Sequence, residues 1–151
     1  GELTFFSRLL DGEYIDYERI IVKTHKIKVT LDKEEFYSAL ERAALITEEK
    51  IAGSVRAHVK LDIKEDNLRI YAMSVAGSTY DELNVDHEGD DILIAFNNRF
   101  LLDSVRSCSG EKVRLMLSSP LGSMNIEPDS DEYKENGIEE LFMLLPVRTK
   151  D

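Results

Sequence analysis

The residues best suited to chemistry are three histidines and one short acidic cluster. His25, His58 and His87 form no short-spaced pair of the HxxxH type that binds zinc on a helix. His87 belongs to the run Asp86-His87-Glu88-Gly89-Asp90-Asp91, whose side chains include metal-ligand types. This run lies between two predicted strands and is typical of a charged hairpin loop. We therefore expect no metal site.

Motifs for covalent catalysis or phosphate binding are also missing from the sequence. It contains no GxSxG, no GxxxxGK and no GxGxxG. The single cysteine, Cys108, has no histidine near it in sequence and is interpreted as a small buried thiol on a helix. The acidic run from Asp129 to Glu140 lacks the oxygen spacing and central glycine of a calcium loop, so a solvated, mobile loop is predicted. The sequence thus predicts a protein that is not an enzyme and has no cofactor.

The composition indicates a soluble globular protein. A chain of 151 residues, 42% hydrophobic and 32% charged, suits one domain with a sizeable core, or one domain plus the remnant of another. Its net charge of −11 argues against gripping nucleic acid with the whole surface, although a local basic face would still allow loose contact. A lone cysteine cannot form an internal disulfide, which favours a reducing, cytoplasmic location.

The elements that position these side chains follow one pattern twice: a strand, a helix and three further strands. The first copy comprises a strand at 27–31, a helix capped by Asp32 and reaching Ile46, and strands at 55–63, 68–73 and 79–85. The second comprises a strand at 92–96, a helix capped by Asn97 or Asn98 and reaching Cys108, and strands at 113–117, 123–126 and 140–145. A period of about 60 residues predicts a pseudo-symmetric α+β domain with two helices on one face of antiparallel sheet.

A further strand is predicted at residues 2–10, ending at the turn Asp11-Gly12. Residues 23–26 are the best candidate for a linker. We expect the chain to be a piece of a longer protein. Residues 1–23 would then be the last piece of a preceding domain, and residues 24–151 the domain that follows.

Two segments far apart in the sequence are unusually apolar for their positions. Residues 14–21 are rich in tyrosine and isoleucine, and exposed patches of this kind usually mark interaction sites. A linker packed on the domain would also explain them. Residues 141–145 are continuously apolar and are followed by Pro146 and Arg148. A terminal strand stopped by proline explains part of this second pattern, but not the arginine that follows.

Together with the motifs between them, these segments resemble the bacterial sliding clamp family, the DNA polymerase III beta subunit. The resemblance is carried by 11–20 (DGEYIDYERI), 43–50 (AALITEEK), 68–72 (LRIYA), 94–97 (IAFN) and 144–148 (LLPVR). It covers nearly the whole chain and keeps the order of the motifs. It implies a DNA clamp domain, the C-terminal one, in a non-catalytic replication processivity factor. In that family two chains of three such domains form a head-to-tail ring around duplex DNA.

The resemblance also implies roles for individual residues. A groove for short apolar peptides from the polymerase and the clamp loader would be formed by Ile15, Arg19, Ile20, Met143, Leu144, Leu145, Pro146, Val147 and Arg148. Leu45 and Ile46 would contribute to the subunit interface. Arg42, Arg99 and Arg106 would face DNA through contacts that read no base sequence. An ordinary charged helix exterior would also account for these three arginines.

Two points depart from the family pattern: the family often has proline where this chain has Ile15, and Thr149-Lys150-Asp151 extends past Arg148. The family groove also has another wall from an earlier part of the middle domain, which this chain does not include. The sequence also leaves open whether this chain alone is a monomer. The alternative function is a free-standing peptide-binding adaptor of the same fold that does not act on DNA.

Overall fold

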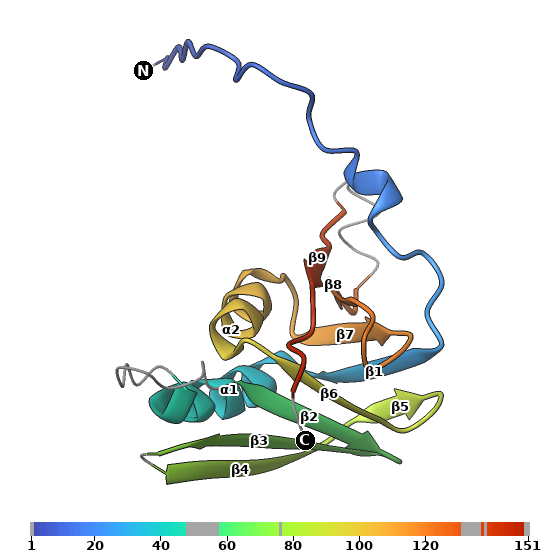
Figure 1. Cartoon of the computed structure of the whole chain (residues 1–151). Coiled ribbons are helices and arrows are strands. Elements are labelled where there is room, and N and C mark those ends of the chain that lie inside the picture. The colour runs from blue at the N-terminus through green and yellow to red at the C-terminus, as the bar shows by residue number, and fades with distance from the viewer. Residues whose placement is uncertain (1, 48–57, 76, 131–136, 138, 150–151) are drawn as a thin grey trace.

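The structure is a computed structural model that describes residues 2–47, 58–75, 77–130, 137 and 139–149 (Figure 1). Four sequence predictions fall partly outside these residues. They concern the loop after Thr47, the start of the strand at 55–63, the turn at 76–78 and the centre of the acidic run.

The predicted pattern of two repeats is confirmed. The first repeat comprises β1 (Ile27–Asp32), α1 (Lys33–Thr47), β2 (Val59–Lys64), β3 (Asn67–Ser74) and β4 (Gly77–Asn84). The second comprises β6 (Ile92–Phe96), α2 (Asn98–Ser107), β7 (Lys112–Leu117), β8 (Met124–Pro128) and β9 (Phe142–Leu144). A short strand, β5 (Asp86–Glu88), joins them, and a 3₁₀ turn, η1 (Tyr17–Arg19), precedes them.

The strands divide into two antiparallel sheets that exchange strands between the repeats. The sheet orders are β4-β3-β2-β6 and β5-β1-β7-β8-β9. The first strand of each repeat therefore pairs with the second strand of the other: Val29 lies opposite Leu115, and Leu61 lies opposite Ile94. Because of this exchange, each sheet contains strands of both repeats.

Side-chain caps and buried stripes explain why the two helices form where they do. The Asp32 carboxylate accepts a hydrogen bond from the Glu35 backbone N–H at 2.9 Å, which caps α1 as predicted. Asn97 Oδ1 accepts from the Arg99 N–H at 3.0 Å and caps α2. One face of each helix is buried, and α1 packs on α2, β3 and β4 (Figure 1). Of the described residues, neither helix has the length and apolar character needed to cross a membrane.

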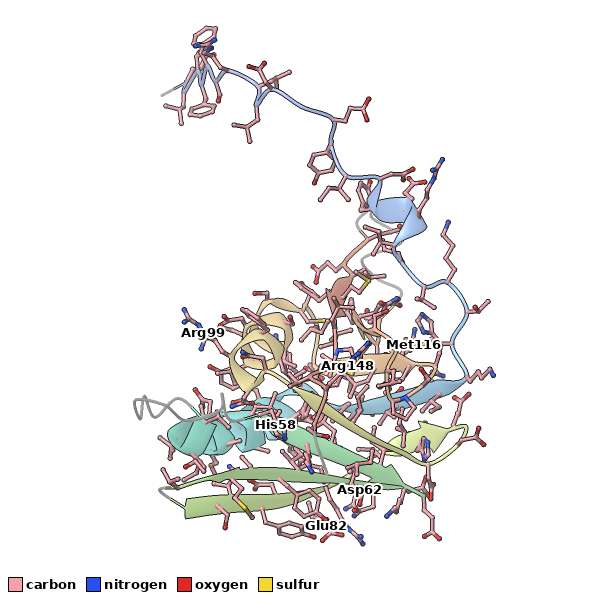
Figure 2. All side chains as sticks on the ribbon, viewed as in Figure 1. His58, Asp62, Glu82, Arg99, Met116 and Arg148 are labelled. Atoms are coloured by element: carbon pink, nitrogen blue, oxygen red, sulfur yellow. The ribbon has the colours of Figure 1, made fainter. Side chains whose placement is uncertain are left out.

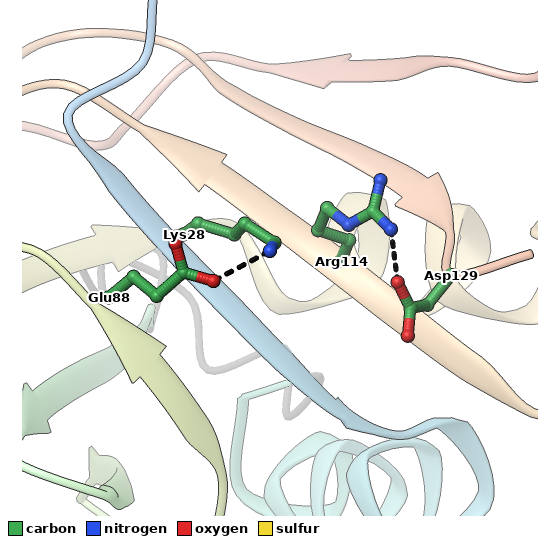
Figure 3. A network of polar contacts seen from close by, with 4 residues as sticks. All are labelled: Lys28, Glu88, Arg114 and Asp129. Carbon is green, nitrogen blue, oxygen red and sulfur yellow. Dashed lines mark hydrogen bonds and ion pairs between the residues drawn. The ribbon is translucent and has the colours of Figure 1, made fainter.

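The run Asp86 to Asp91 is not simply a loop, so that prediction is wrong in part. Asp86–Glu88 form β5, which pairs with β1. Lys28 Nζ lies 2.7 Å from Glu88 Oε1 across this pair, and this hydrogen bond lowers the pKa of Glu88 (Figure 3). Gly89 closes the turn with φ +110°, and a Cβ at this position would lie 2.3 Å from the Lys26 carbonyl oxygen. The sequence pattern describes only near neighbours, so it did not predict that Glu88 pairs with Lys28, 60 residues earlier in the sequence.

The predicted strand at residues 2–10 is also wrong. These residues form no strand, and the side chains of Leu3, Phe6 and Leu10 are at least 90% exposed. A strand needs a neighbouring strand to satisfy its backbone groups, and no other described segment lies beside this one. Among the described residues, hydrogen bonds join this part of the chain to the domain at residues 22–26. There Asn125 Nδ2 donates to the Val22 carbonyl at 3.2 Å, and Lys26 N donates to Leu117 O at 3.0 Å.

Candidate functional site

A groove of about 670 Å³ lies between α2 and the segment that contains β9. We call it the α2–β9 groove. Its lining residues are His58, Asn97, Phe100, Asp103, Ser104, Met143, Leu144, Leu145 and Val147.

The path of the chain after β9 creates this groove. β9 lies at the edge of the five-stranded sheet, and β6 at the edge of the four-stranded sheet. Pro146, which has no backbone N–H to donate, follows β9. The chain then crosses between the sheets, and Val147 N donates to the Ala95 carbonyl of β6 at 2.8 Å. The α2–β9 groove is the space between this crossing segment and α2.

The walls of the groove are largely apolar and open to solvent. Leu144 is buried and anchors the floor, whereas Leu145 is 72% exposed and Phe100 is 62% exposed. Concave sites with adjacent exposed apolar side chains favour binding of an apolar ligand. The rim supplies polar groups, and the orientation of Asn97 among them is fixed because its Oδ1 caps α2.

Within the described part of the chain, no three His, Cys, Asp or Glu side chains gather as metal ligands. The Cys108 thiol is buried, and this burial raises its pKa to about 11, so it is a poor nucleophile at neutral pH.

A second groove, of about 410 Å³, lies on the other side of the crossing segment. We call it the β6–tail groove. Its lining residues are Lys60, Leu93, Ile94, Ala95, Pro120, Leu121, Val147, Arg148 and Thr149.

The structure gathers the C-terminal half of the predicted peptide site and not the N-terminal half. Met143, Leu144, Leu145 and Val147 line the α2–β9 groove, and Arg148 lines the β6–tail groove. Pro146 lies between them in sequence. The other three predicted residues, Ile15, Arg19 and Ile20, line neither groove. They are at or beside η1, where the exposed Arg19 forms an ion pair with Asp16 at 2.8 Å.

Sequence reasoning missed several lining residues. The helical spacing of Phe100, Leu101 and Val105 predicts that all three face the core, but the Phe100 side chain is exposed in the groove. The sequence did contain one signal for this exposure. Leu101 and Val105 are four residues apart and share one helix face, whereas Phe100, one residue earlier, is rotated about 100° away from that face. His58 and Leu121 reach the grooves from strands and loops far away in sequence, and no local pattern pointed to them.

The two predicted interface residues at the end of α1 differ in burial. Leu45 is 78% exposed, whereas Ile46 is half-buried, with Cδ1 3.8 Å from the position of a Cβ on Gly77. Leu45 is therefore the one available to another protein surface.

The three arginines predicted to face DNA differ in their partners. Arg42 donates from Nη2 to Asp81 Oδ1 at 2.6 Å, and this hydrogen bond raises its pKa. Arg106 donates to the Tyr37 hydroxyl at 3.0 Å and lies over the Tyr37 ring. Arg99 extends away from α2, and its side chain forms no ion pair in the described part of the chain (Figure 2).

Glu140 ties the segment before β9 to the end of α2. Its carboxylate accepts from Ser109 N at 2.9 Å and from Ser109 Oγ at 2.6 Å. These hydrogen bonds lower the pKa of Glu140, because they favour its charged form. This end of the predicted acidic run is therefore fixed to the domain.

Replacing Glu140 with Gln is expected to lower the free energy of unfolding by about 1 kcal/mol at neutral pH. Since the folded-state pKa of Glu140 is lowered, its stabilisation is complete above the ordinary value of 4.5 and is lost as the pH falls through the folded-state value. Urea denaturation should thus show a clear difference at pH 7 and a smaller one near pH 3. The exposed neighbour Glu139 is the matched control, since Glu139→Gln removes the same charge. An equal loss in both variants would contradict this role.

Comparison with solved structures defines the class of this fold. The DNA polymerase III beta subunit of Thermotoga maritima superposes with a TM-score of 0.82 at 29% identity, covering 95% of this chain and 36% of that one. The beta subunit of Bartonella birtlesii, solved with griselimycin bound, gives a TM-score of 0.80 at 28% identity, with the same coverage. The fold is that of a DNA clamp domain.

Sequence comparison gives the family. Residues 18–141 match the family described as DNA polymerase III beta subunit, C-terminal domain. The chain is also 30% identical over 149 residues to the beta sliding clamp of Pseudomonas putida, covering 98% of this chain and 38% of that protein. This chain therefore belongs to the DNA polymerase III beta subunit family, and it spans a little more than a third of the length of such relatives.

Proposed function

We propose that this chain is the C-terminal part of a replication sliding clamp, which tethers a DNA polymerase and other partners by binding short apolar peptides. The observation that carries the proposal is the α2–β9 groove, an open apolar site in a domain of this family. An apolar slot gains about 25 cal/mol per Å² of surface removed from water. After ordering costs, a few leucine- or phenylalanine-like side chains support affinities of about micromolar.

In the whole protein, two chains would join head to tail and encircle duplex DNA in the cytoplasm. Processivity would then be topological, because a closed ring leaves DNA only by opening or by reaching an end, and no catalytic step is needed. The exposed Leu45 supports a protein contact at the end of α1, with Ile46 as its packed neighbour. Residues 1–23 would belong to the preceding domain, whose sheet would cover their exposed apolar side chains. The clamp loader would bind the same groove as the polymerase.

The two helices would face the DNA, with Arg99 as the arginine best placed to reach phosphate. Arg42 and Arg106 are already engaged by Asp81 and Tyr37, so their reach is more limited. Replacing Arg99 with Gln in the full-length protein should weaken DNA association at every sequence and lower the salt slope by about one. Fluorescence anisotropy on two unrelated duplexes at several salt concentrations measures this. A loss confined to one duplex would contradict a contact that reads no sequence.

A topological test separates the ring from an adaptor that does not act on DNA. The full-length protein should remain on circular DNA during gel filtration and be released when one cut makes that DNA linear. Leu45→Asp places a charge in the proposed subunit interface and should abolish retention. The charge-matched control is Leu141→Asp, which lies outside both grooves and away from α1. Equal retention on circular and linear DNA would contradict encirclement.

A further inference from the structure

We propose that Glu140 is a positioning residue for peptide binding, because its contact with Ser109 fixes the separation of the two walls of the α2–β9 groove before a peptide arrives. This inference rests on the proposed function and adds what holds the site in the shape that its ligand needs. Neither residue lines the groove, so Glu140 would act on the peptide only through the wall that it anchors.

The two walls of the α2–β9 groove are joined at both of their ends. One wall is α2, and the other is the segment from Glu140 to Val147 that contains β9. Beyond the C-terminal end of α2, the Glu140 carboxylate accepts hydrogen bonds from Ser109 N at 2.9 Å and from Ser109 Oγ at 2.6 Å. Before the N-terminal end of α2, Val147 N donates to the Ala95 carbonyl at 2.8 Å. The groove therefore lies between two attachments that together set the spacing of its walls.

The attachment at Glu140 matters because β9 has few other bonds to fix its position. β9 has three residues and pairs with β8 at the edge of the five-stranded sheet (Figure 1). A strand this short, paired on one side, forms few backbone hydrogen bonds, so side-chain contacts contribute more to its placement. The Glu140 contact is made just before β9 begins, and it therefore controls how closely this strand approaches α2.

The negative charge of Glu140 strengthens its contact with Ser109. Hydrogen bonds to a carboxylate are roughly twice as strong as those between neutral groups. The two bonds from Ser109 lower the pKa of Glu140, and the ammonium group of Lys33 on α1 lowers this pKa further. Glu140 is therefore charged at neutral pH, and its contact is a permanent support for the groove rather than a pH switch.

Loss of this support would change peptide binding in a recognisable way. Without it, the walls would adopt several separations, and only a fraction of the molecules would have the separation that fits a peptide. The apparent affinity falls in proportion to that fraction. Because the peptide would touch neither Glu140 nor Ser109, the loss would lie in the association rate, whereas loss of a direct contact raises the dissociation rate.

Stopped-flow fluorescence anisotropy at neutral pH tests the inference on the 151-residue chain, with a short fluorescent peptide of leucine and phenylalanine residues as the probe. We expect Glu140→Ala to weaken binding about fivefold through slower association, with a dissociation rate within about twofold of that of the unchanged chain. Glu140→Gln keeps an oxygen that accepts from Ser109 N, so this conservative variant should recover most of the lost affinity.

Two further variants separate positioning from general effects. Ser109→Ala removes the hydroxyl donor and keeps the backbone N–H, so about a twofold loss of peptide affinity is expected. The matched control is Glu88→Ala. Glu88 is also a carboxylate held by a hydrogen bond, 2.7 Å from Lys28 Nζ, but it lies on β5 at the opposite edge of the same sheet. This control should bind the peptide as tightly as the unchanged chain, and urea denaturation shows that each variant is folded under the binding conditions.

The outcomes separate this inference from the proposed function. If the unchanged chain binds the peptide and Glu140→Ala binds it equally well, the inference is overturned and the peptide groove stands. Weaker binding of Glu140→Ala through faster dissociation alone would show a direct contact, and an equal loss in Glu88→Ala would show a general effect of charge or stability. Either result would also overturn positioning by Glu140. If the unchanged chain does not bind the peptide at all, the proposed function is overturned, and this inference with it.

Discussion

Leu145→Asp is expected to weaken binding of an apolar partner peptide by at least about tenfold. The Leu145 side chain is 72% exposed at the mouth of the α2–β9 groove, so it has little packing to lose in the free chain. In a complex, the same position would be covered, and an aspartate there would be a desolvated carboxylate with no partner. Fluorescence anisotropy with a short apolar peptide measures the affinity directly.

The control for this prediction is Leu141→Asp. It introduces the same change four residues earlier, at a partly exposed leucine that lines neither groove. The affinity of the Leu141→Asp variant for the peptide should stay within about twofold of that of the unchanged chain, because surface substitutions outside an interface have small effects. Equal losses of peptide affinity in the two variants, or unchanged peptide binding by Leu145→Asp, would contradict the assignment of the α2–β9 groove as the peptide site.

Asn98→Ala is expected to lower the free energy of unfolding by about 2 kcal/mol. Asn98 is 1% exposed, and its Nδ2 donates to the Leu40 carbonyl at 3.0 Å and to Thr47 Oγ1 at 3.2 Å. It therefore joins the start of α2 to the second half of α1. Alanine would leave the Leu40 carbonyl without this donor and open a small cavity between the helices. Urea denaturation at neutral pH measures the change.

Thr47→Val distinguishes the contributions of the two hydrogen bonds that Asn98 Nδ2 donates. It removes the hydroxyl partner and retains the shape of the side chain and the bond to Leu40, so a loss below about 1 kcal/mol is expected. If Asn98→Ala lost no more than Thr47→Val, the bond to the Leu40 carbonyl would not hold the helices together as we infer.

Short-range patterns predicted the parts of the fold that depend on near neighbours in sequence. The alternation at residues 27–31 predicted β1, which the structure extends by one residue to Asp32. Asp32, and either Asn97 or Asn98, were predicted as helix caps because a cap oxygen and the backbone N–H groups that donate to it lie within three residues of each other. The structure confirms Asp32 as one cap and selects Asn97 as the other.

Long-range pairing was beyond these patterns. The exchange of strands between repeats joins Val29 to Leu115, and nothing in either strand specifies that partner. The strand predicted at 2–10 failed for the same reason, since its apolar residues carry a strand pattern but no partner strand is present among the described residues. A strand pattern indicates a tendency, and pairing is a tertiary event.

The candidate site was likewise predicted only where its residues are neighbours in the sequence. Its C-terminal segment, from Met143 to Arg148, was predicted because its residues are contiguous and its motif resembles the family. The opposing wall was not predicted, because Phe100 and Asn97 come from α2 and its cap and meet Leu145 only through the crossing of the chain between the sheets.

The most direct test of the account is a backbone-amide NMR titration of the 151-residue chain with a short apolar peptide. We predict shifts that saturate and that cluster at Asn97–Ser104 and Met143–Arg148, with loss of these shifts in the Leu145→Asp variant. The absence of shifts at these residues at millimolar peptide, or a cluster elsewhere on the domain, would contradict the claim that the α2–β9 groove is the partner site.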